Sequence, residues 1–141
     1  MDILTLELRV ENRYTEIERV NSEFNEFSRK NGFPDPVRRK FNTVFDELLN
    51  NIISYAFRDE GIHIIKIQVT YQAPSVTVEI SDDGIPFNLF EVAPPDPHLN
   101  LAERPVGGLG IHLVRNMMDS YFYERIGHRN KTTLIKHIGQ Q

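Results

Sequence analysis

Apolar side chains recur three and four residues apart through the middle of the chain, which is the spacing of one face of a helix. The positions on this face are Val37, Phe41, Val44, Leu48 and Ile52. Asp35, which can cap a helix N-terminus, and Pro36, which suits the first helical position, precede them. The pattern predicts a long helix that begins at this pair, runs through Phe41–Phe57 and ends near Arg58–Gly61.

Helical spacing also appears in Tyr14–Asn31, where Gly32 provides a stop, and after Gly107–Gly110. The apolar side of this last helix is expected to consist of Leu113, Val114, Met117 and Met118. Other segments have the pattern of strands with one buried face. The predicted strands are Ile3–Val10, His63–Tyr71, Ser75–Ser81, Tyr121–Ile126 and Thr132–Ile138, with a turn over 128–131 before the last.

The segment Phe87–Val106 has little periodicity and contains four prolines. A loop of this length in a compact domain is usually a functional lid or disordered. The order is therefore strand, two helices, two strands, lid, helix and two strands. Strands that meet through short turns favour an α+β two-layer sandwich, with a mixed, mostly antiparallel sheet and three helices on one face. We expect a single domain over residues 1–141.

The composition narrows the classes of function. With 141 residues, 40% apolar and 26% charged, the chain has the make-up of one soluble globular domain. The net charge of −4 argues against a surface that binds duplex nucleic acid. Because there is no cysteine, disulfides, thiol chemistry and cysteine zinc sites are excluded. No apolar run has the length of a signal peptide or membrane span, so we expect a cytoplasmic protein without a membrane partner.

Glu47 and Asn51 are four residues apart on the central helix, so they lie one turn apart at the edge of its apolar stripe. A carboxylate and an amide at the rim of a buried face cost desolvation energy unless a metal ion, a water or the backbone pairs with them. Taken alone, the pair is more typical of a solvated helix edge than of a catalytic site.

Asp82-Asp83-Gly84 follows a predicted strand, and Asp-Gly is among the commonest turn dipeptides. The alternation of that strand, however, places Asp82 on the same side as Val78 and Ile80, towards the helices. A carboxylate at the mouth of an apolar cleft can accept a hydrogen bond from an exocyclic amine. This is a way to recognise the edge of adenine.

The glycines of Gly107–Gly110 stand at a predicted helix start. Glycine lets the backbone approach a ligand, and free N–H groups at a helix N-terminus attract phosphate. The same glycines would also let the loop turn into the helix. The cluster lacks the lysine of a Walker loop and the preceding strand of a dinucleotide fingerprint.

In combination, the chain shows ExxxN on a helix, DxGxP after a strand, a long loop and GxG at a helix start. This order resembles the GHKL (histidine-kinase-like) ATPase family, which includes gyrase, histidine kinases and MutL. The segments DDGIPFN and GGLGIHLVRNMMD are similar to the branch of anti-sigma factor serine/threonine kinases. The resemblance runs from the first strand to Thr133. It implies a Bergerat-type ATP-binding fold with ATP or ADP and Mg²⁺ as ligands.

The resemblance implies a role for each matched position. Asn51 matches the asparagine that holds Mg²⁺ against the phosphates, and Glu47 matches the acidic residue that serves as general base. Asp82 matches the aspartate that reads adenine, and Gly84 the glycine that makes room for the base. Pro86 is usual at its position in this branch, and is assigned to the nucleotide site with them.

The start of the third helix matches the phosphate-binding segment, in which Gly108 and Gly110 are the phosphate-loop glycines. The nucleotide-binding residues implied there are Gly108, Leu109, Gly110, Ile111 and His112. Arg115 follows in the same run and is expected to fix the lid or the phosphates. Thr133 matches a threonine near the adenine pocket on a late strand. Tyr55 departs from the family, whose members often have histidine at this position.

Two functions follow from the resemblance. The first is an ATP-dependent protein serine kinase that phosphorylates an anti-anti-sigma (STAS-type) protein and sequesters a sigma factor or another regulator. The second is an ATP/ADP-gated binding module of a partner switch without kinase activity. The intact Glu47 favours the first. A homodimer through the first strand and the neighbouring helix is also implied, with no direct contact to nucleic acid.

Overall fold

The structure is a computed structural model that describes residues 2–91 and 108–138, with backbone alone at 108–111. Most of the predicted lid, and Gly107, lie outside the described residues. The described elements are β1 (Leu4–Glu11), α1 (Thr15–Lys30), α2 (Asp35–Tyr55), β2 (Ile64–Gln72), β3 (Ser75–Asp82), the 3₁₀ turn η1 (Leu89–Glu91), α3 (Gly108–Met117), β4 (Ser120–Ile126) and β5 (Arg129–His137).

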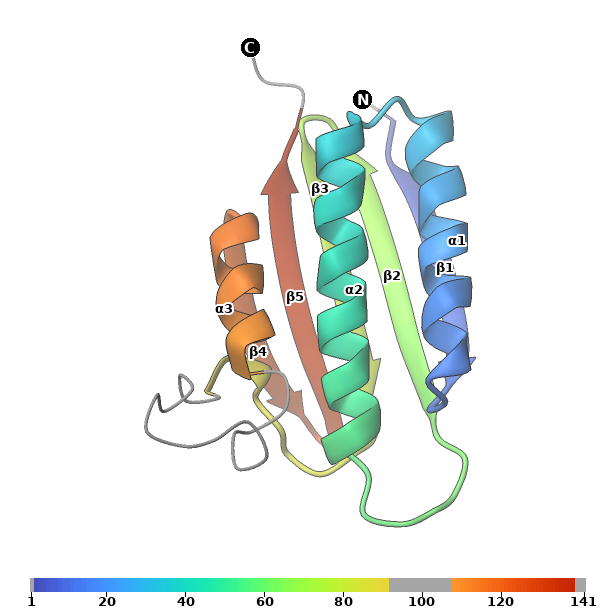
Figure 1. Ribbon diagram of the computed structural model, residues 1–141, viewed down its shortest axis with the longest axis vertical. Coiled ribbons are helices and arrows are strands. Elements are labelled where there is room, and N and C mark those ends of the chain that lie inside the picture. The colour runs from blue at the N-terminus through green and yellow to red at the C-terminus, as the bar shows by residue number, and fades with distance from the viewer. Residues whose placement is uncertain (1, 92–107, 139–141) are drawn as a thin grey trace.

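The described strands form one five-stranded sheet in the order β1-β2-β3-β5-β4. Each of their four pairings is antiparallel. The helices α1, α2 and α3 cover one face of this sheet, and α2 lies between the other two and contacts both (Figure 1). The predicted α+β two-layer sandwich and its element order are confirmed. Among the described helices, none is long and apolar enough to cross a membrane.

The core lies between α2 and the sheet. The predicted stripe is confirmed, because Phe41, Val44, Leu48 and Ile52 are buried, while Val37 is half-buried. Phe45 and Leu49 are buried as well, since a helix flanked on both sides and backed by a sheet buries a wider face. Phe24 of α1 joins them, with ring centroids 5.2 Å from both Phe41 and Phe45.

The predicted alternation of buried and less buried residues is also observed in β3. Along β3, Val76, Val78, Ile80 and Asp82 are buried and the residues between them are not. The buried set faces the helices, and the other set faces the open side of the sheet. Asp82 therefore points into the molecule at the last position of a strand.

Both ends of α2 differ from the prediction. The helix begins at Asp35 itself, Pro34 occupies the N-cap position, and no side chain caps the helix. The prediction that Asp35 is the cap is wrong, and its carboxylate lies 3.6 Å from Nε of Arg38 instead. The helix ends at Tyr55, earlier than predicted, and the carbonyl oxygen of the next residue, Ala56, accepts a hydrogen bond from the N–H of Ile85 (2.8 Å).

Two further predictions near the C-terminus are wrong. Leu113 was expected in the core but is 46% exposed. The last hairpin turns at Gly127 and His128, since Ile126 pairs with Arg129 and Gly127 has a φ of +60°. Residues 129–131, predicted as turn, therefore belong to β5. This change places Asn130 in the sheet.

Phe45→Ala tests the central packing. Because Phe45 is fully buried against Phe24, its truncation is expected to lower the free energy of unfolding by about 3–5 kcal/mol. Urea denaturation measures this change. Lys30→Ala, at an exposed position on α1, is the control and is expected to change the free energy by less than about 0.5 kcal/mol. Equal effects of the two variants would contradict the packing described.

Candidate functional site

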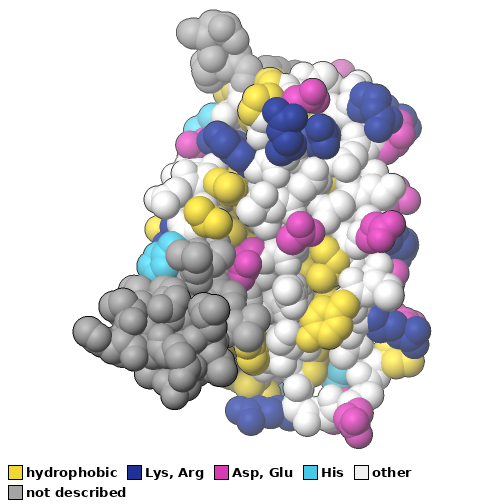
Figure 2. Space-filling view, viewed as in Figure 1, with side chains coloured by type: hydrophobic (Ala, Val, Ile, Leu, Met, Phe, Trp, Pro, Cys, Tyr) yellow, Lys and Arg dark blue, Asp and Glu magenta, His cyan; other side chains and the backbone are white. Residues whose placement is uncertain are grey.

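Most of the predicted site residues gather at one end of the sandwich. The C-terminal end of α2, the end of β3, the start of β5 and the start of α3 all lie at the lower end in Figure 1. The fold thus brings together segments that are far apart in the sequence. The helical face around them carries charged side chains of both signs, with apolar side chains exposed between them (Figure 2).

Glu47 and Asn51 pair with each other on α2. The Nδ2 atom of Asn51 donates to Oε2 of Glu47 and to the Glu47 carbonyl oxygen, both at 2.7 Å. Asn51 is 3% exposed, so these bonds offset most of the desolvation cost of its amide nitrogen. No described residue donates to its Oδ1 atom, which is a ligand type that Mg²⁺ prefers.

Asp82 is 2% exposed at the end of β3. Its Oδ1 atom accepts from the Gly84 N–H (2.8 Å) and from Nδ2 of Asn130 (2.9 Å). Burial raises the pKa of this carboxyl group, while the bonds from Asn130 and Gly84 and the charge of Arg129 oppose the rise. Within the described residues, Oδ2 makes no hydrogen bond. It is the oxygen that can accept from a ligand amine.

Gly84 lies where no other residue fits. A Cβ at this position would stand 2.9 Å from both the carbonyl carbon and the Cβ of Ala56, and closer still to the carbonyl oxygen. The contact joins the loop after β3 to the end of α2. Pro86 follows in that loop with an exposed side chain. The glycine predicted to make room for a base thus has a structural role in this close backbone approach.

Asn130 is a site residue that the sequence interpretation missed, because it lay in the predicted turn. It is directly opposite Asp82 in the β3–β5 register and is 3% exposed. The single glycine Gly127 between two strand patterns was the signal that would have indicated a tighter hairpin. Such a hairpin extends β5 back to Arg129 and brings Asn130 into register.

The register between β3 and β5 also shows on which face of the sheet Thr133 lies. Thr133 pairs with Glu79 and so faces the open side of the sheet, away from Asp82. Thr132 pairs with Ile80 and faces the helices, on the side of Asp82 and Asn130. The placement of Thr133 beside an adenine pocket is therefore wrong for this fold, and Thr132 is the threonine on the correct face.

Gly108, Leu109, Gly110 and Ile111 form the first turn of α3. Backbone N–H groups in a first turn have no partner within the helix, which suits an anion. His112 follows, and its buried Nε2 atom has no hydrogen-bond partner among the described residues. Arg115 is half-buried one turn further on. Among the described residues, no group of three or more His, Cys, Asp or Glu side chains could hold a metal ion.

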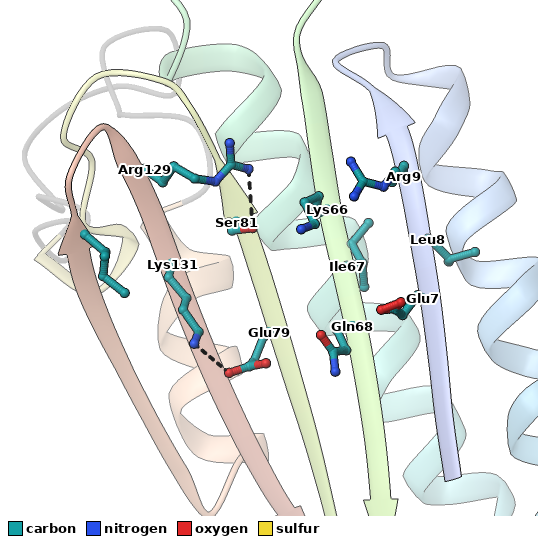
Figure 3. A pocket seen from close by; sticks show the side chains of 11 residues that line it. Glu7, Leu8, Arg9, Lys66, Ile67, Gln68, Glu79, Ser81, Arg129 and Lys131 are labelled. Atoms are coloured by element: carbon teal, nitrogen blue, oxygen red, sulfur yellow. Dashed lines mark hydrogen bonds and ion pairs between the residues drawn. The ribbon is translucent and has the colours of Figure 1, made fainter.

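A separate hollow of about 260 Å³ lies on the open face of the sheet. Figure 3 shows its charged lining, in which Lys131 pairs with Glu79 at 2.8 Å and Arg129 reaches Ser81. This hollow is on the opposite side of the sheet from Asp82. Because none of the predicted nucleotide-binding side chains lines it, we do not assign the predicted ligand to it.

His63 links the loop before β2 to the loop after β3. Its Nε2 atom lies 2.8 Å from Asp59 and its Nδ1 atom 3.0 Å from Asp83, and its ring stacks on Phe57 with centroids 4.5 Å apart. The hydrogen bond with Asp59, helped by that with Asp83, raises the pKa of His63, while burial opposes the rise. The protonated imidazole, which donates from both nitrogens, fits this arrangement.

Comparisons with known proteins identify the family to which the sequence is similar. A family model for the histidine kinase-like ATPase domain matches residues 10–136. Serine/threonine-protein kinase BtrW of Bordetella bronchiseptica is 30% identical over 92 residues, which cover 65% of this chain and 65% of that kinase, just under two thirds of its length. Serine-protein kinase RsbW of Listeria monocytogenes is 25% identical over 122 residues, which cover 84% of this chain and 76% of that kinase.

Among solved structures, Acinetobacter baumannii histidine kinase AdeS matches with a TM-score of 0.52 at 14% identity. The match covers 94% of this chain and 68% of that chain. At this level of identity the likeness concerns the fold. It agrees with the two-layer arrangement described above.

Gly84→Ala tests the close approach to α2. Since the obstacle is the backbone of Ala56, the new Cβ is expected to lower the free energy of unfolding by about 1–3 kcal/mol. Gly61→Ala is the matched control, because the nearest atoms that its Cβ would meet are side-chain atoms of Asp59 and His63 rather than backbone atoms. Chemical denaturation compares the two variants. A smaller cost at Gly84 than at Gly61 would contradict the contact.

His63 is expected to make stability depend on pH. The pKa of His63 in the folded protein is above the ordinary value of 6.5. Its contribution to the free energy of unfolding is therefore complete below pH 6.5 and is lost as pH rises through the folded pKa. Unfolding measured across this range should show stability that falls with pH in the wild type and a flatter profile in His63→Gln. His128→Gln, an exposed histidine in the last hairpin, should keep the wild-type slope.

Proposed function

Because the chain belongs to the family of histidine kinase-like ATPase domains, we propose that it is an ATP-dependent protein serine kinase of a partner switch. In this proposal it phosphorylates an anti-anti-sigma (STAS-type) protein and sequesters a sigma factor or a related regulator. The observation that carries the proposal is the pairing of Glu47 with Asn51 at the rim of the buried face of α2. The names of the two curated relatives, both protein kinases that act on serine, support it.

Adenine recognition is assigned to Asp82. Its Oδ1 atom is held by Gly84 and Asn130, so Oδ2 can accept from the exocyclic amine of the base. Thr132 faces the same side of the sheet and takes the place of Thr133 in the expected pocket. A carboxylate acceptor favours adenine, which presents an amine, over a base that presents a carbonyl oxygen at the same edge.

The phosphates are assigned to the first turn of α3. Backbone N–H groups of this turn would donate to phosphate oxygens, and Nε2 of His112, which no described residue contacts by a hydrogen bond, offers one more polar contact. Asn51 would hold Mg²⁺ through Oδ1, since its nitrogen is committed to Glu47. Mg²⁺ bound there would neutralise phosphate charge, and its remaining ligands would be phosphate oxygens and waters.

Glu47 is assigned as the general base. Its carboxylate is within hydrogen-bond contact of Asn51, so it stands beside the position where the terminal phosphate would lie. It would take the proton of a serine hydroxyl as the serine oxygen bonds to the γ-phosphorus and the bond to the bridging oxygen of ADP breaks. In phosphoryl transfer most of the rate comes from positioning and charge neutralisation, and the base adds to these.

The alternative is a nucleotide-gated binding module without kinase activity, which the same ATP site would serve. The carboxylate of Glu47 favours the kinase, because binding alone does not require a base at this position. Homodimerisation and a cytoplasmic location are parts of the proposal that come from the family resemblance.

Phosphate transfer tests the proposal. The protein is incubated with labelled ATP, Mg²⁺ and a purified STAS-type protein, and label on the partner's serine is measured. Glu47→Gln is expected to keep ADP binding, measured by calorimetry, while its transfer rate falls by about 10²–10⁴-fold. Asp46→Asn, the neighbouring exposed acid on α2, is the matched control and should transfer at the wild-type rate.

Three outcomes separate the possibilities. Transfer at the wild-type rate by Glu47→Gln would show that Glu47 is not the base. Nucleotide binding without any transfer by the wild type would favour the binding module. Absence of ADP binding by the folded wild type would refute both functions.

A further inference from the structure

We propose that Asn130 is a positioning residue for base recognition: its amide N–H holds one oxygen of the Asp82 carboxylate and so fixes the direction of the other. The role in recognition rests on the proposed nucleotide site, whereas the effect on Asp82 does not require a nucleotide. Neither the sequence motifs nor the family resemblance marked Asn130.

Asn130 is the centre of a buried hydrogen-bond network. Its Nδ2 atom donates to Oδ1 of Asp82 at 2.9 Å and to the carbonyl oxygen of Ile85 at 2.7 Å. Its Oδ1 atom accepts from the N–H of Phe87 at 3.1 Å, from Nη1 of Arg125 at 3.2 Å and from the hydroxyl of Tyr123. Both amide hydrogens are therefore used, and three donors converge on the amide oxygen.

These partners fix the direction of the amide. A backbone N–H and a guanidinium can only donate, so the group that faces Phe87 and Arg125 must be the oxygen. The carbonyl of Ile85 can only accept, so the group that faces it must be the nitrogen. A flipped amide would lose the bonds to Phe87, Arg125 and Ile85. Asn130 therefore presents an N–H to Asp82 in one fixed orientation.

The consequence for Asp82 is that one oxygen is occupied and the other is left for a ligand. Asn130 and the Gly84 N–H both hold Oδ1, which fixes the plane of the carboxylate. Of the charged groups around it, Arg129 favours the ionised form and Asp83 opposes it. Donation by Asn130 acts in the same direction as Arg129 and opposes the rise in the pKa of Asp82 that burial causes, although burial has the larger effect.

Asn130 also connects Asp82 to the loop that follows it. The same amide holds Ile85 and Phe87, and Arg125 donates to the carbonyl oxygen of Gly84 at 2.8 Å. The side chain of Asn130, on the neighbouring strand β5, thus holds both the loop and the Asp82 carboxylate. A change at this position is expected to alter both the charge of Asp82 and its direction.

The first measurement uses the protein without nucleotide. The pKa of Asp82 is followed by carboxylate NMR titration, with the signal assigned by its absence in Asp82→Asn. Asn130→Ala is expected to raise the pKa of Asp82 above the wild-type value. Val20→Ala, a buried position on α1 away from the network, controls for loss of stability and should leave the pKa unchanged.

The second measurement concerns base selection. Affinities for ADP and for inosine diphosphate, which has a carbonyl oxygen in place of the amine, are measured by calorimetry. Asn130→Ala is expected to weaken ADP binding by about tenfold or more and to reduce the preference for ADP. In an Asp82→Asn background, Asn130→Ala should have little further effect, because the residue acts through Asp82.

Tyr123→Phe is the second variant, for the case that Asn130→Ala does not fold. It removes one donor that holds the amide oxygen, and it should raise the pKa of Asp82 by a smaller amount. An unchanged pKa of Asp82 in the folded variants, or an unchanged preference for ADP over inosine diphosphate, would overturn the inference. If the wild type binds no ADP, the proposed function fails, while the titration alone still decides whether Asn130 controls Asp82.

Discussion

A buried carboxylate at the end of a strand is the constraint on which the site depends. Asp82 is 2% exposed, and an ionised group at such a position is unstable unless donors surround it. The donors come from two directions, the backbone of its own loop at Gly84 and the side chain of Asn130 on the neighbouring strand. Their geometry fixes the carboxylate through Oδ1, and its second oxygen makes no hydrogen bond with the described residues.

The antiparallel sheet supplies this geometry. Because β3 and β5 are neighbours with Asp82 opposite Asn130, the two side chains project on the same face and at hydrogen-bond distance. The residues just before them, Ser81 and Arg129, project to the other face, where they line a charged hollow. One end of two strands therefore presents a buried polar pair towards the helices and a charged surface on the open side.

The central helix links this pair to the rest of the molecule. Its apolar face forms the core, and its rim carries Glu47 and Asn51, whose side chains are joined by a hydrogen bond. It ends where the carbonyl of Ala56 meets the loop of Gly84 and Ile85. The proposed base and cation ligand, and the proposed adenine acceptor, are thus attached to one rigid unit. This arrangement suits a reaction that depends on positioning more than on covalent help.

The sequence by itself determined the element types, the order of the elements, the core face of α2 and the inward direction of Asp82. These features follow from periods of 3.6 and 2 residues, which are local properties of the chain. The tertiary structure decided where α2 ends, that Asn130 stands opposite Asp82, and that Thr132 rather than Thr133 faces the helices. Each of these depends on register or on contacts between distant segments, and a shift of one residue in a strand exchanges its two faces.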